Sequence, residues 1–294
     1  MKSVNQLKFV VFFVVAIAAT TSCRKEVQQT PLENEAAEEI ILPEETGALA
    51  GRENNASKLA CNTFYGPCVK MGKKHIRSWI NIAKCNNKPV AIGVEFYKGS
   101  LENLPTDPMN FPANTFILKL HQKAKESTPF NHITINWEPT GHEPDGIYRV
   151  PHFDIHFYKI SVAAQMAITG LPGAPPPAGY LPPSYVIPGA TVPQMGSHWL
   201  DPSSPELPPT SAPFTHTFIY GSDNGKVIFL EPMITKAFLL GGSTVTKAFP
   251  QPIHFAPANT NYPQKYKIWK TWGDGRNYVA VSYTHLTLPT NREV

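Results

Sequence analysis

The sequence predicts a mainly β fold, formed by a single antiparallel domain of sandwich or barrel type with one or two short helices. Thirty prolines and an aromatic content of 11% favour short strands and packed loops over long helices. Short segments in which apolar and polar residues alternate recur between clusters of turn-forming residues. Residues 61–280 are numerous enough for one large hydrophobic core, so we expect one β-rich domain there.

Residues 1–22 have the parts of an export signal in their usual order. After a lysine-bearing start, Phe9–Ala19 is an uninterrupted apolar run. It fits a signal-peptide core of about 7–15 residues, whereas a membrane-spanning helix needs about 20. Small residues then lead to Cys23, which resembles the lipobox of bacterial lipoproteins, although Thr20 stands where leucine is usual. We expect cleavage before Cys23 and lipidation of its thiol; the alternative is an ordinary signal peptide with a chance cysteine.

Residues 23–60 are rich in glutamate and lack apolar periodicity. Such a segment buries too little apolar surface to offset chain entropy, so we expect an acidic flexible tether. A lipid on Cys23 would place the domain in the bacterial cell envelope, held to the membrane by that lipid. Arg24 and Lys25 replace the aspartate that favours inner-membrane retention, which makes the outer membrane the preferred location.

Alternating residues predict the strands of residues 61–280. A hairpin turn is expected at Asn86–Asn87, between two of these strands. In His132–Trp137, the residues Ile133, Ile135 and Trp137 share one face, and the polar residues between them share the other. The predicted strands before residue 161 are Arg77–Ile82, Pro89–Tyr97, Thr115–Leu120, His132–Trp137 and Gly146–Ile160.

The second half of the domain is rich in turns. Ser161–Thr169 is the best candidate for a helix, because a glycine and a proline follow it. Residues 171–213 are saturated with proline but carry interspersed aromatic residues, so we expect a long ordered loop packed on the domain rather than a linker. Phe214–Tyr220 and Val227–Met233 should form a hairpin around Asn224–Gly225, because both turn residues tolerate positive φ.

Residues 281–294 read VSYTHLTLPTNREV, which resembles the translated sequencing-adapter read-through found at the end of unrelated metagenomic reading frames. We therefore expect a non-native tail, a last strand that is incomplete near Ala280, and no function for His285.

Three further cysteines follow Cys23, and outside the cytoplasm they are free to form a disulfide. The spacing favours a bond between Cys61 and Cys68 across a turn at Gly66–Pro67, with Cys85 left over. Without a CxxC pair, three cysteines are only a weak zinc signal.

The most informative segment is Pro151–Tyr158. Alternate side chains of a strand share a face, with neighbours two apart separated by about 6–7 Å. One face then carries four polar groups and the other joins the core. Imidazoles in a His-x-His pattern can bind one ion, and a carboxylate between them can fix a ring tautomer. The four polar residues are His152, Asp154, His156 and Tyr158.

Glu231 lies in the apolar run Val227–Ile234, where an unpaired carboxylate is costly and needs a partner. One interpretation is a site for a divalent metal, zinc or similar, with His152, His156, His198 and Glu231 as the candidate ligands. The competing interpretation, which we favour slightly, is a hydrogen-bonded network that fixes the strand against the proline-rich loop. The expected network residues are His142, Glu143, Asp154, Tyr158 and His216.

His216 and His132 have simpler interpretations. His216 shares a face with Phe214 and Phe218, so it reads more as a core histidine than as a ligand. His132 reads as a surface residue.

Motifs narrow the function only partly. The chain has no G-x-S-x-G, H-E-x-x-H or P-loop motif. A net charge of +4 without a basic, aromatic-rich cluster argues against nucleic-acid binding. We favour a membrane-tethered envelope lipoprotein that acts as a binding or assembly module. The alternative is a metal-dependent envelope enzyme with a His-x-Asp-x-His site. Protein partners and homo-oligomerisation stay open.

Several of these segments also resemble the signature blocks FYGP, GHEP, PHFDxHFY, MGxHW and FTHTFIYG of one exported bacterial family, a domain of unknown function. The resemblance covers about residues 60–280 and implies a single exported domain, without an activity or an assigned catalytic residue. The three cysteines after Cys23 depart from the family pattern. The matching segments are Phe64–Pro67, Gly141–Pro144, Pro151–Tyr158, Met195–Trp199 and Phe214–Gly221.

Overall fold

The computed structural model describes residues 60–187, 191–271, 278–284 and 286–289, all of which belong to the unit Glu35–Val294. The expected signal peptide, the lipidation site Cys23 and the tether up to residue 59 lie outside the described residues. Within those residues, no helix is long and apolar enough to cross a membrane.

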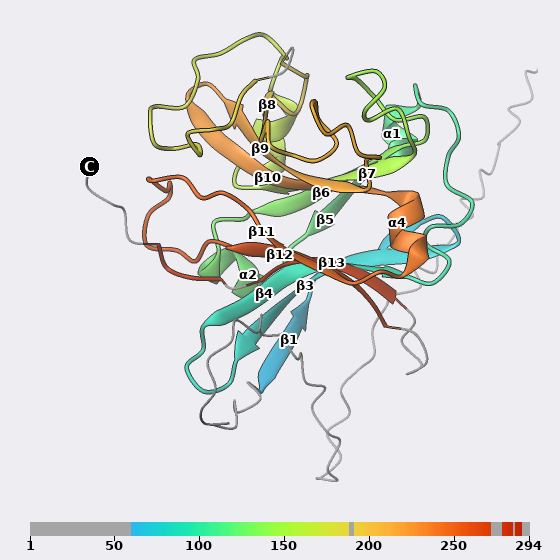
Figure 1. Cartoon of the computed structure of the whole chain (residues 1–294). Coiled ribbons are helices and arrows are strands. Elements are labelled where there is room, and N and C mark those ends of the chain that lie inside the picture. The colour runs from blue at the N-terminus through green and yellow to red at the C-terminus, as the bar shows by residue number, and fades with distance from the viewer. Residues whose placement is uncertain (1–59, 188–190, 272–277, 285, 290–294) are drawn as a thin grey trace, which may run out of the picture. The chain divides into compact units, whose positions relative to one another are not determined.

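The described chain is mainly β, as predicted, and its strands form two antiparallel sheets that pack in two layers (Figure 1). The first sheet has the order β1-β3-β4-β13-β12-β11, with β2 also paired to β3. Its strands are β1 (Cys61–Tyr65), β2 (Val69–Met71), β3 (Lys74–Ala83), β4 (Pro89–Tyr97), β11 (Val245–Ala248), β12 (Lys265–Thr271) and β13 (Tyr278–Thr284).

The second sheet has the order β5-β6-β7-β10-β9-β8, and β7 and β10 at its centre carry the histidine-rich segment and Glu231. Its strands are β5 (Thr115–Lys119), β6 (His132–Glu138), β7 (His152–Tyr158), β8 (Ser197–Leu200), β9 (His216–Asp223) and β10 (Lys226–Thr235).

The hydrophobic core lies between the two sheets. Ile133, Ile135 and Trp137 of β6 point into it, which confirms the face predicted from their alternation. On β7, Phe157 packs against Tyr283 of the opposite sheet, with ring centroids 4.5 Å apart. The polar residues of β6 and β7 therefore lie on the outer face of the second sheet.

The predicted hairpins and helix are present. Asn224 and Gly225 adopt positive φ values of 45° and 78° in the β9–β10 turn. Ser161 caps the predicted helix by accepting a hydrogen bond from the backbone of Ala164 at 3.2 Å. The described residues contain four short helices rather than one or two: α1 (Phe111–Asn114), α2 (Gln122–Ser127), α3 (Val162–Met166) and α4 (Lys236–Gly241).

The strand predicted over Gly146–Ile160 is shorter, because β7 begins only at His152. The preceding residues fold back on themselves. Gly141 has a φ of 69°, and the His142 amide donates to the Tyr148 carbonyl at 3.3 Å. Residues 139–151 thus form a loop, here called the 139–151 loop.

The predicted disulfide between Cys61 and Cys68 is wrong, since the structure forms no disulfide between them. Gly66–Pro67 does not reverse the chain. Tyr65 pairs with Trp79, and Val69 pairs with Ile76 further along the same strand β3. An extended chain advances about 3.3 Å per residue, so the two cysteines end too far apart for the ~7 Å Cα limit of a disulfide.

The last strand does not stop near Ala280. Residues 281–284 complete β13, where Val281 pairs with Val94 of β4 and with Ile268 of β12. Val281 and Tyr283 are fully buried. The pairing of β13 does not test whether residues 281–294 are a non-native tail, which stays a prediction. His285 lies outside the described residues.

Candidate metal centre

The outer face of the second sheet carries a polar cluster that loops cover. Tyr148 of the 139–151 loop packs against Phe214, with ring centroids 4.8 Å apart, and donates a hydrogen bond to Glu206 at 3.2 Å. Both partners come from the expected proline-rich loop or its end. This cover leaves His156 with no exposed surface and Glu231 with 1%.

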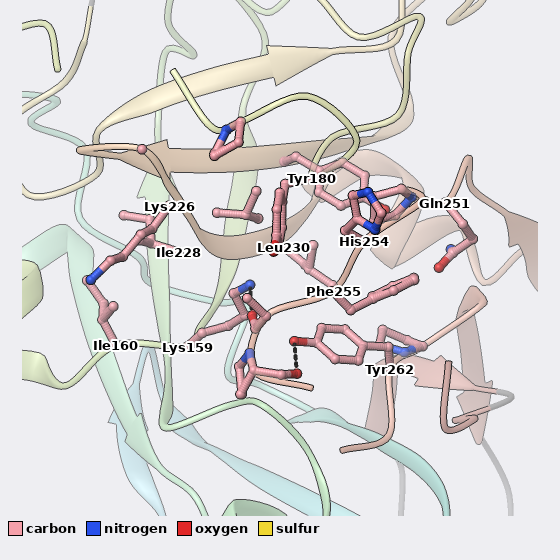
Figure 2. Close-up of a pocket in the computed structure, with 18 of the residues that line it drawn as sticks. Lys159, Ile160, Tyr180, Lys226, Ile228, Leu230, Gln251, His254, Phe255 and Tyr262 are labelled. Carbon is pink, nitrogen blue, oxygen red and sulfur yellow. Dashed lines mark hydrogen bonds between the residues drawn. The ribbon is translucent and has the colours of Figure 1, made fainter. Parts of the chain in front are cut away.

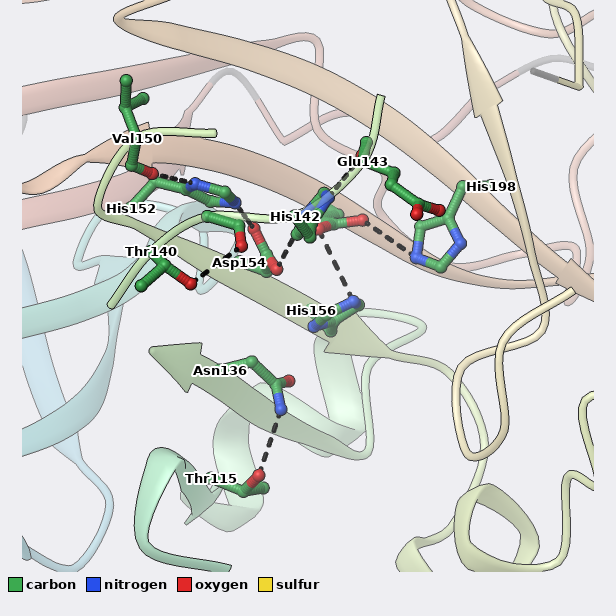
Figure 3. A network of polar contacts seen from close by, with 12 residues as sticks. Thr115, Asn136, Thr140, His142, Glu143, Val150, His152, Asp154, His156 and His198 are labelled. Atoms are coloured by element: carbon green, nitrogen blue, oxygen red, sulfur yellow. Dashed lines mark hydrogen bonds and ion pairs between the residues drawn. The ribbon is translucent and has the colours of Figure 1, made fainter. Parts of the chain in front are cut away.

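His156, His198 and Glu231 converge in this cluster, and one potential ligand atom from each lies within 4.8 Å of the others. Glu231 Oε1 lies 3.5 Å from Nε2 of His156, and Oε2 lies 3.8 Å from Nε2 of His198 (Figure 3). The three side chains come from β7, β8 and β10. Three strands of one sheet therefore position the group, which gives it a rigid base.

The atoms of this group are not satisfied by protein partners. Within the described residues, Oε2 of Glu231 has no hydrogen-bond partner, and the two ring nitrogens of His156 make no hydrogen bond of good geometry, although the Thr134 backbone is close enough to affect the pKa of the ring. Burying such groups unpaired costs about 1–3 kcal/mol each. The side chain of His198 is 21% exposed, so one side of the group reaches solvent.

The protonation of the group suits a cation. Burial, reinforced by the Asp154 carboxylate, raises the pKa of Glu231 well above its ordinary value. Burial lowers the pKa of His156 to about 3 and that of His198 to about 4. Both imidazoles are therefore uncharged at neutral pH when no cation is present, and the surroundings of Glu231 favour the neutral form of its carboxyl group. Neutral imidazole is the form that binds metals, and a cation would displace the carboxyl proton.

Phe229 forms an apolar wall of this group. Its ring centroid lies 4.7 Å from that of His156 and 5.3 Å from that of His198. The ring lies directly against Gly221 on β9, and a Cβ atom at Gly221 would overlap it. Glycine at this position therefore leaves room for Phe229 to pack against both imidazoles, with its ring nearly perpendicular to that of His156.

His142, His152 and Asp154 form a second group, again with ligand atoms within 4.8 Å of one another. Asp154 contacts Nε2 of His152 at 3.1 Å and Nε2 of His142 at 3.4 Å. The other ring nitrogens lie 2.7 Å from the Val150 carbonyl and 2.6 Å from the Glu143 carbonyl (Figure 3). Because a carbonyl oxygen only accepts hydrogen bonds, the Nδ1 atom of each ring must donate. In a neutral ring Nε2 then carries no proton, so it would face the Asp154 carboxylate as a second acceptor. Only a positively charged ring has a proton on Nε2 to donate to that carboxylate.

A second proton on the His142 ring removes this unfavourable contact between two acceptors for one of the two histidines. Burial lowers the pKa of His142, but the Asp154 carboxylate outweighs that effect and raises the pKa to about 9. Burial raises the pKa of Asp154, but His152 and His142 lower it more strongly and hold it well below its ordinary value. His142 is therefore an imidazolium at neutral pH, next to an ionised carboxylate.

The structure thus regroups the expected metal ligands. His156, His198 and Glu231 come together, whereas His152 joins Asp154 and His142. Tyr158 lies on the same face as predicted, where its hydroxyl donates to the Gln194 carbonyl at 3.0 Å.

Two residues expected in the polar network lie outside it. The exposed side chain of Glu143 is 3.7 Å from Arg149. His216 is on the core side of β9, where it bonds the Tyr266 hydroxyl at 2.8 Å.

Two polar residues of this face escaped the sequence analysis. His132, expected at the surface, is 2% exposed and bonds Gln165 at 2.7 Å, because α3 covers this end of β6. Glu138 lies opposite His152, and burial, with Asp154 adding, raises its pKa to about 7. Extending the alternation of His132–Trp137 by one residue would have placed Glu138 on the polar face.

Comparison of the chain with protein-family models, with curated proteins and with solved structures found no match.

Proposed function

We propose that this protein binds a divalent metal ion through His156, His198 and Glu231. One observation carries the proposal: within the part of the chain that the structure describes, Oε2 of Glu231 and both ring nitrogens of His156 are buried without a hydrogen bond of good geometry. A metal ion bound there would replace the missing hydrogen bonds of the carboxylate and of one imidazole nitrogen.

A purely structural network accounts less well for these atoms. Such a network is expected to satisfy its buried members. Two imidazoles and one carboxylate instead suit zinc or a neighbouring first-row metal. The partial exposure of His198 leaves a coordination position for water or a ligand.

The expected lipid on Cys23 and the acidic tether complete the proposal. They would hold this metal-binding domain at the bacterial envelope, preferably at the outer membrane. In that setting the domain acts as a binding module whose loop-covered face takes up the ion.

One observation favours catalysis as a second candidate function. His142 carries a proton close to the metal-binding group, and its charge partly opposes the burial that raises the pKa of Glu231. A metal ion with three protein ligands and an open position activates water, and an adjacent imidazolium can donate a proton to a leaving group. The metal-loaded protein would then hydrolyse activated esters such as p-nitrophenyl acetate or bis-p-nitrophenyl phosphate, and a Glu231→Gln variant would not.

Metal titration tests the main proposal. The chelator-treated protein should bind about one Zn²⁺ or Co²⁺ per chain, with the visible spectrum of Co²⁺ reporting the geometry. Glu231→Gln and His156→Ala should each weaken binding by more than about 100-fold. His216→Gln is the matched control, because His216 lies on the other side of β9 and bonds Tyr266. Equal affinity in all four proteins would refute the proposed site.

A further inference from the structure

A cavity of about 420 Å³ lies beside the second sheet (Figure 2). The two residues that follow β7, the start of β10 and residues 249–263 contribute most of its lining. Its volume falls within the ~300–1,000 Å³ range of ligand pockets. None of the residues that form the two polar groups lines it, so the cavity is a separate feature.

The walls of the cavity are aromatic and apolar. Tyr180 and His254 pack together with ring centroids 5.5 Å apart, and Phe255 and Tyr262 do so at 4.7 Å. Four prolines also line the cavity, and each has a fixed φ. Flat aromatic walls and stiff backbone suit a ligand with a rigid apolar body.

Hydrogen bonds between distant segments hold these walls in place. The Tyr262 hydroxyl donates to the Pro257 carbonyl at 3.0 Å (Figure 2). The backbone amide of His254 donates to the Gly179 carbonyl at 2.8 Å, which ties residues 249–263 to the proline-rich loop. The cavity is therefore preformed, and a ligand would lose little affinity to ordering it.

The charge of the lining has one sign. Lys159 and Lys226 line the cavity, whereas no aspartate or glutamate does. Nζ of Lys159 donates to the Ala256 carbonyl at 2.7 Å, and within the described part of the chain no carboxylate lies within 4 Å of it. Burial lowers the pKa of Lys159 to about 7, so an anion beside it would favour the charged ammonium.

We propose that this cavity binds an aromatic carboxylate, with the carboxylate at Lys159 and the ring system between the aromatic walls. The apolar body removes aromatic and proline surface from water, and the ion pair supplies the countercharge that the lining lacks. Binding here does not depend on the proposed metal centre.

The test uses 2-naphthoate with two analogues of the same shape, 2-naphthamide and 2-naphthylmethylammonium. Calorimetry in the presence of a chelator, repeated on Glu231→Gln, separates binding in the cavity from binding to a metal ion. We expect 2-naphthoate to bind at least tenfold more tightly than the amide, and the ammonium compound not to bind detectably. Equal affinities for the three compounds, or no binding of 2-naphthoate at millimolar concentration, would overturn the proposal.

Variants locate the site. Lys159→Met keeps the apolar stem and should weaken 2-naphthoate binding at least tenfold, whereas Lys159→Arg should retain it. Lys70→Met, at an exposed position of β2, is the matched control. Because Lys159→Met could perturb folding, Ala256→Trp provides a second test: it fills the exposed rim of the cavity and should abolish binding, while the chain keeps the Lys159 ammonium and the backbone carbonyl of residue 256 that it bonds. Unchanged binding in both Lys159→Met and Ala256→Trp would refute the assignment.

Discussion

Glu231 and His156 face each other across β10 and β7, with Oε1 of the carboxyl group 3.5 Å from Nε2 of the ring. The register, in which Phe229 is opposite Tyr158 and Met233 opposite Asp154, places them on directly opposed positions. Both are buried, and burial favours the uncharged form of each. A metal ion beside Glu231 would favour the ionised carboxylate instead, which is the form that we propose the ion binds.

The buried carboxyl group of Glu231 lowers the free energy of unfolding in the absence of a metal ion, which is the basis of the first prediction. The pKa of Glu231 is raised in the folded state, so its stability contribution is intact below the unfolded pKa of about 4.3 and is lost as pH rises above it. Glu231→Gln should therefore stabilise the chelator-treated protein at pH 8, by about 1–3 kcal/mol, and change little at pH 4. Urea unfolding at both pH values measures the difference.

Saturating Zn²⁺ should reverse this order. The ion stabilises the native protein by mass action, and Glu231→Gln removes a ligand. If Glu231→Gln were less stable than the native protein at pH 8 in the presence of chelator, the first prediction would be contradicted.

The second prediction concerns Gly221. A methyl group there overlaps the Phe229 ring, which must then move from its place beside His156 and His198. We expect Gly221→Ala to destabilise the protein by about 1–3 kcal/mol and to weaken Zn²⁺ binding about tenfold. Thermal unfolding and metal titration measure the two effects.

Gly241 provides the matched control for this substitution. An added Cβ there meets no atom within 4 Å, so Gly241→Ala should be neutral or stabilising by up to about 1 kcal/mol. Similar losses in both variants would show that the Phe229 contact is not the cause.

The third prediction concerns the proton on His142. The Asp154 carboxylate raises the pKa of His142 to about 9 against the opposing effect of burial. In Asp154→Asn the two largest effects that raise the pKa of His142 are lost, while burial still lowers it and the Glu143 carbonyl and Glu231 still raise it, so this pKa should fall from about 9 toward the ordinary value of about 6.5. NMR titration of the ring proton in chelator-treated protein measures both values.

This charge pair also has a pH signature in stability. The contribution of His142 is fully present below the unfolded pKa and is lost as pH rises through about 9. Glu143→Gln is the control, because the exposed side chain of Glu143 pairs with Arg149 and not with the ring of His142. A pKa of His142 that stays near 9 in Asp154→Asn would show that another group carries the effect.

Much of the fold and part of the site follow from local pattern. Alternation placed the core face of β6 correctly, and the Asn224–Gly225 signal placed the β9–β10 turn. The polarity of Glu231 in an apolar strand indicated a buried group in need of a partner, which the structure places beside two imidazoles. These signals are readable because each depends on residues within one strand or turn.

What could not be predicted depends on contacts distant in sequence. His152 and His198 were equivalent as sequence candidates, and only the pairing of β8 with β9 brings His198 to Glu231. Gly66–Pro67 read as a turn, but pairing with β3 keeps the chain extended there. Tertiary pairing overrides the local signal in both cases.

The last prediction tests this regrouping of the histidines. His198 contacts the Glu231 carboxyl group, whereas Nε2 of His152 contacts Asp154. His198→Ala should therefore weaken Zn²⁺ binding by more than about 100-fold, and His152→Ala by less than about tenfold. Calorimetric titration of both variants, with their folding checked by circular dichroism, gives the comparison. A larger loss of Zn²⁺ affinity in His152→Ala than in His198→Ala would show that His152 and His156 of β7 bind the ion. The ligands would then be set by the spacing along β7 and not by the pairing of β8 with β9.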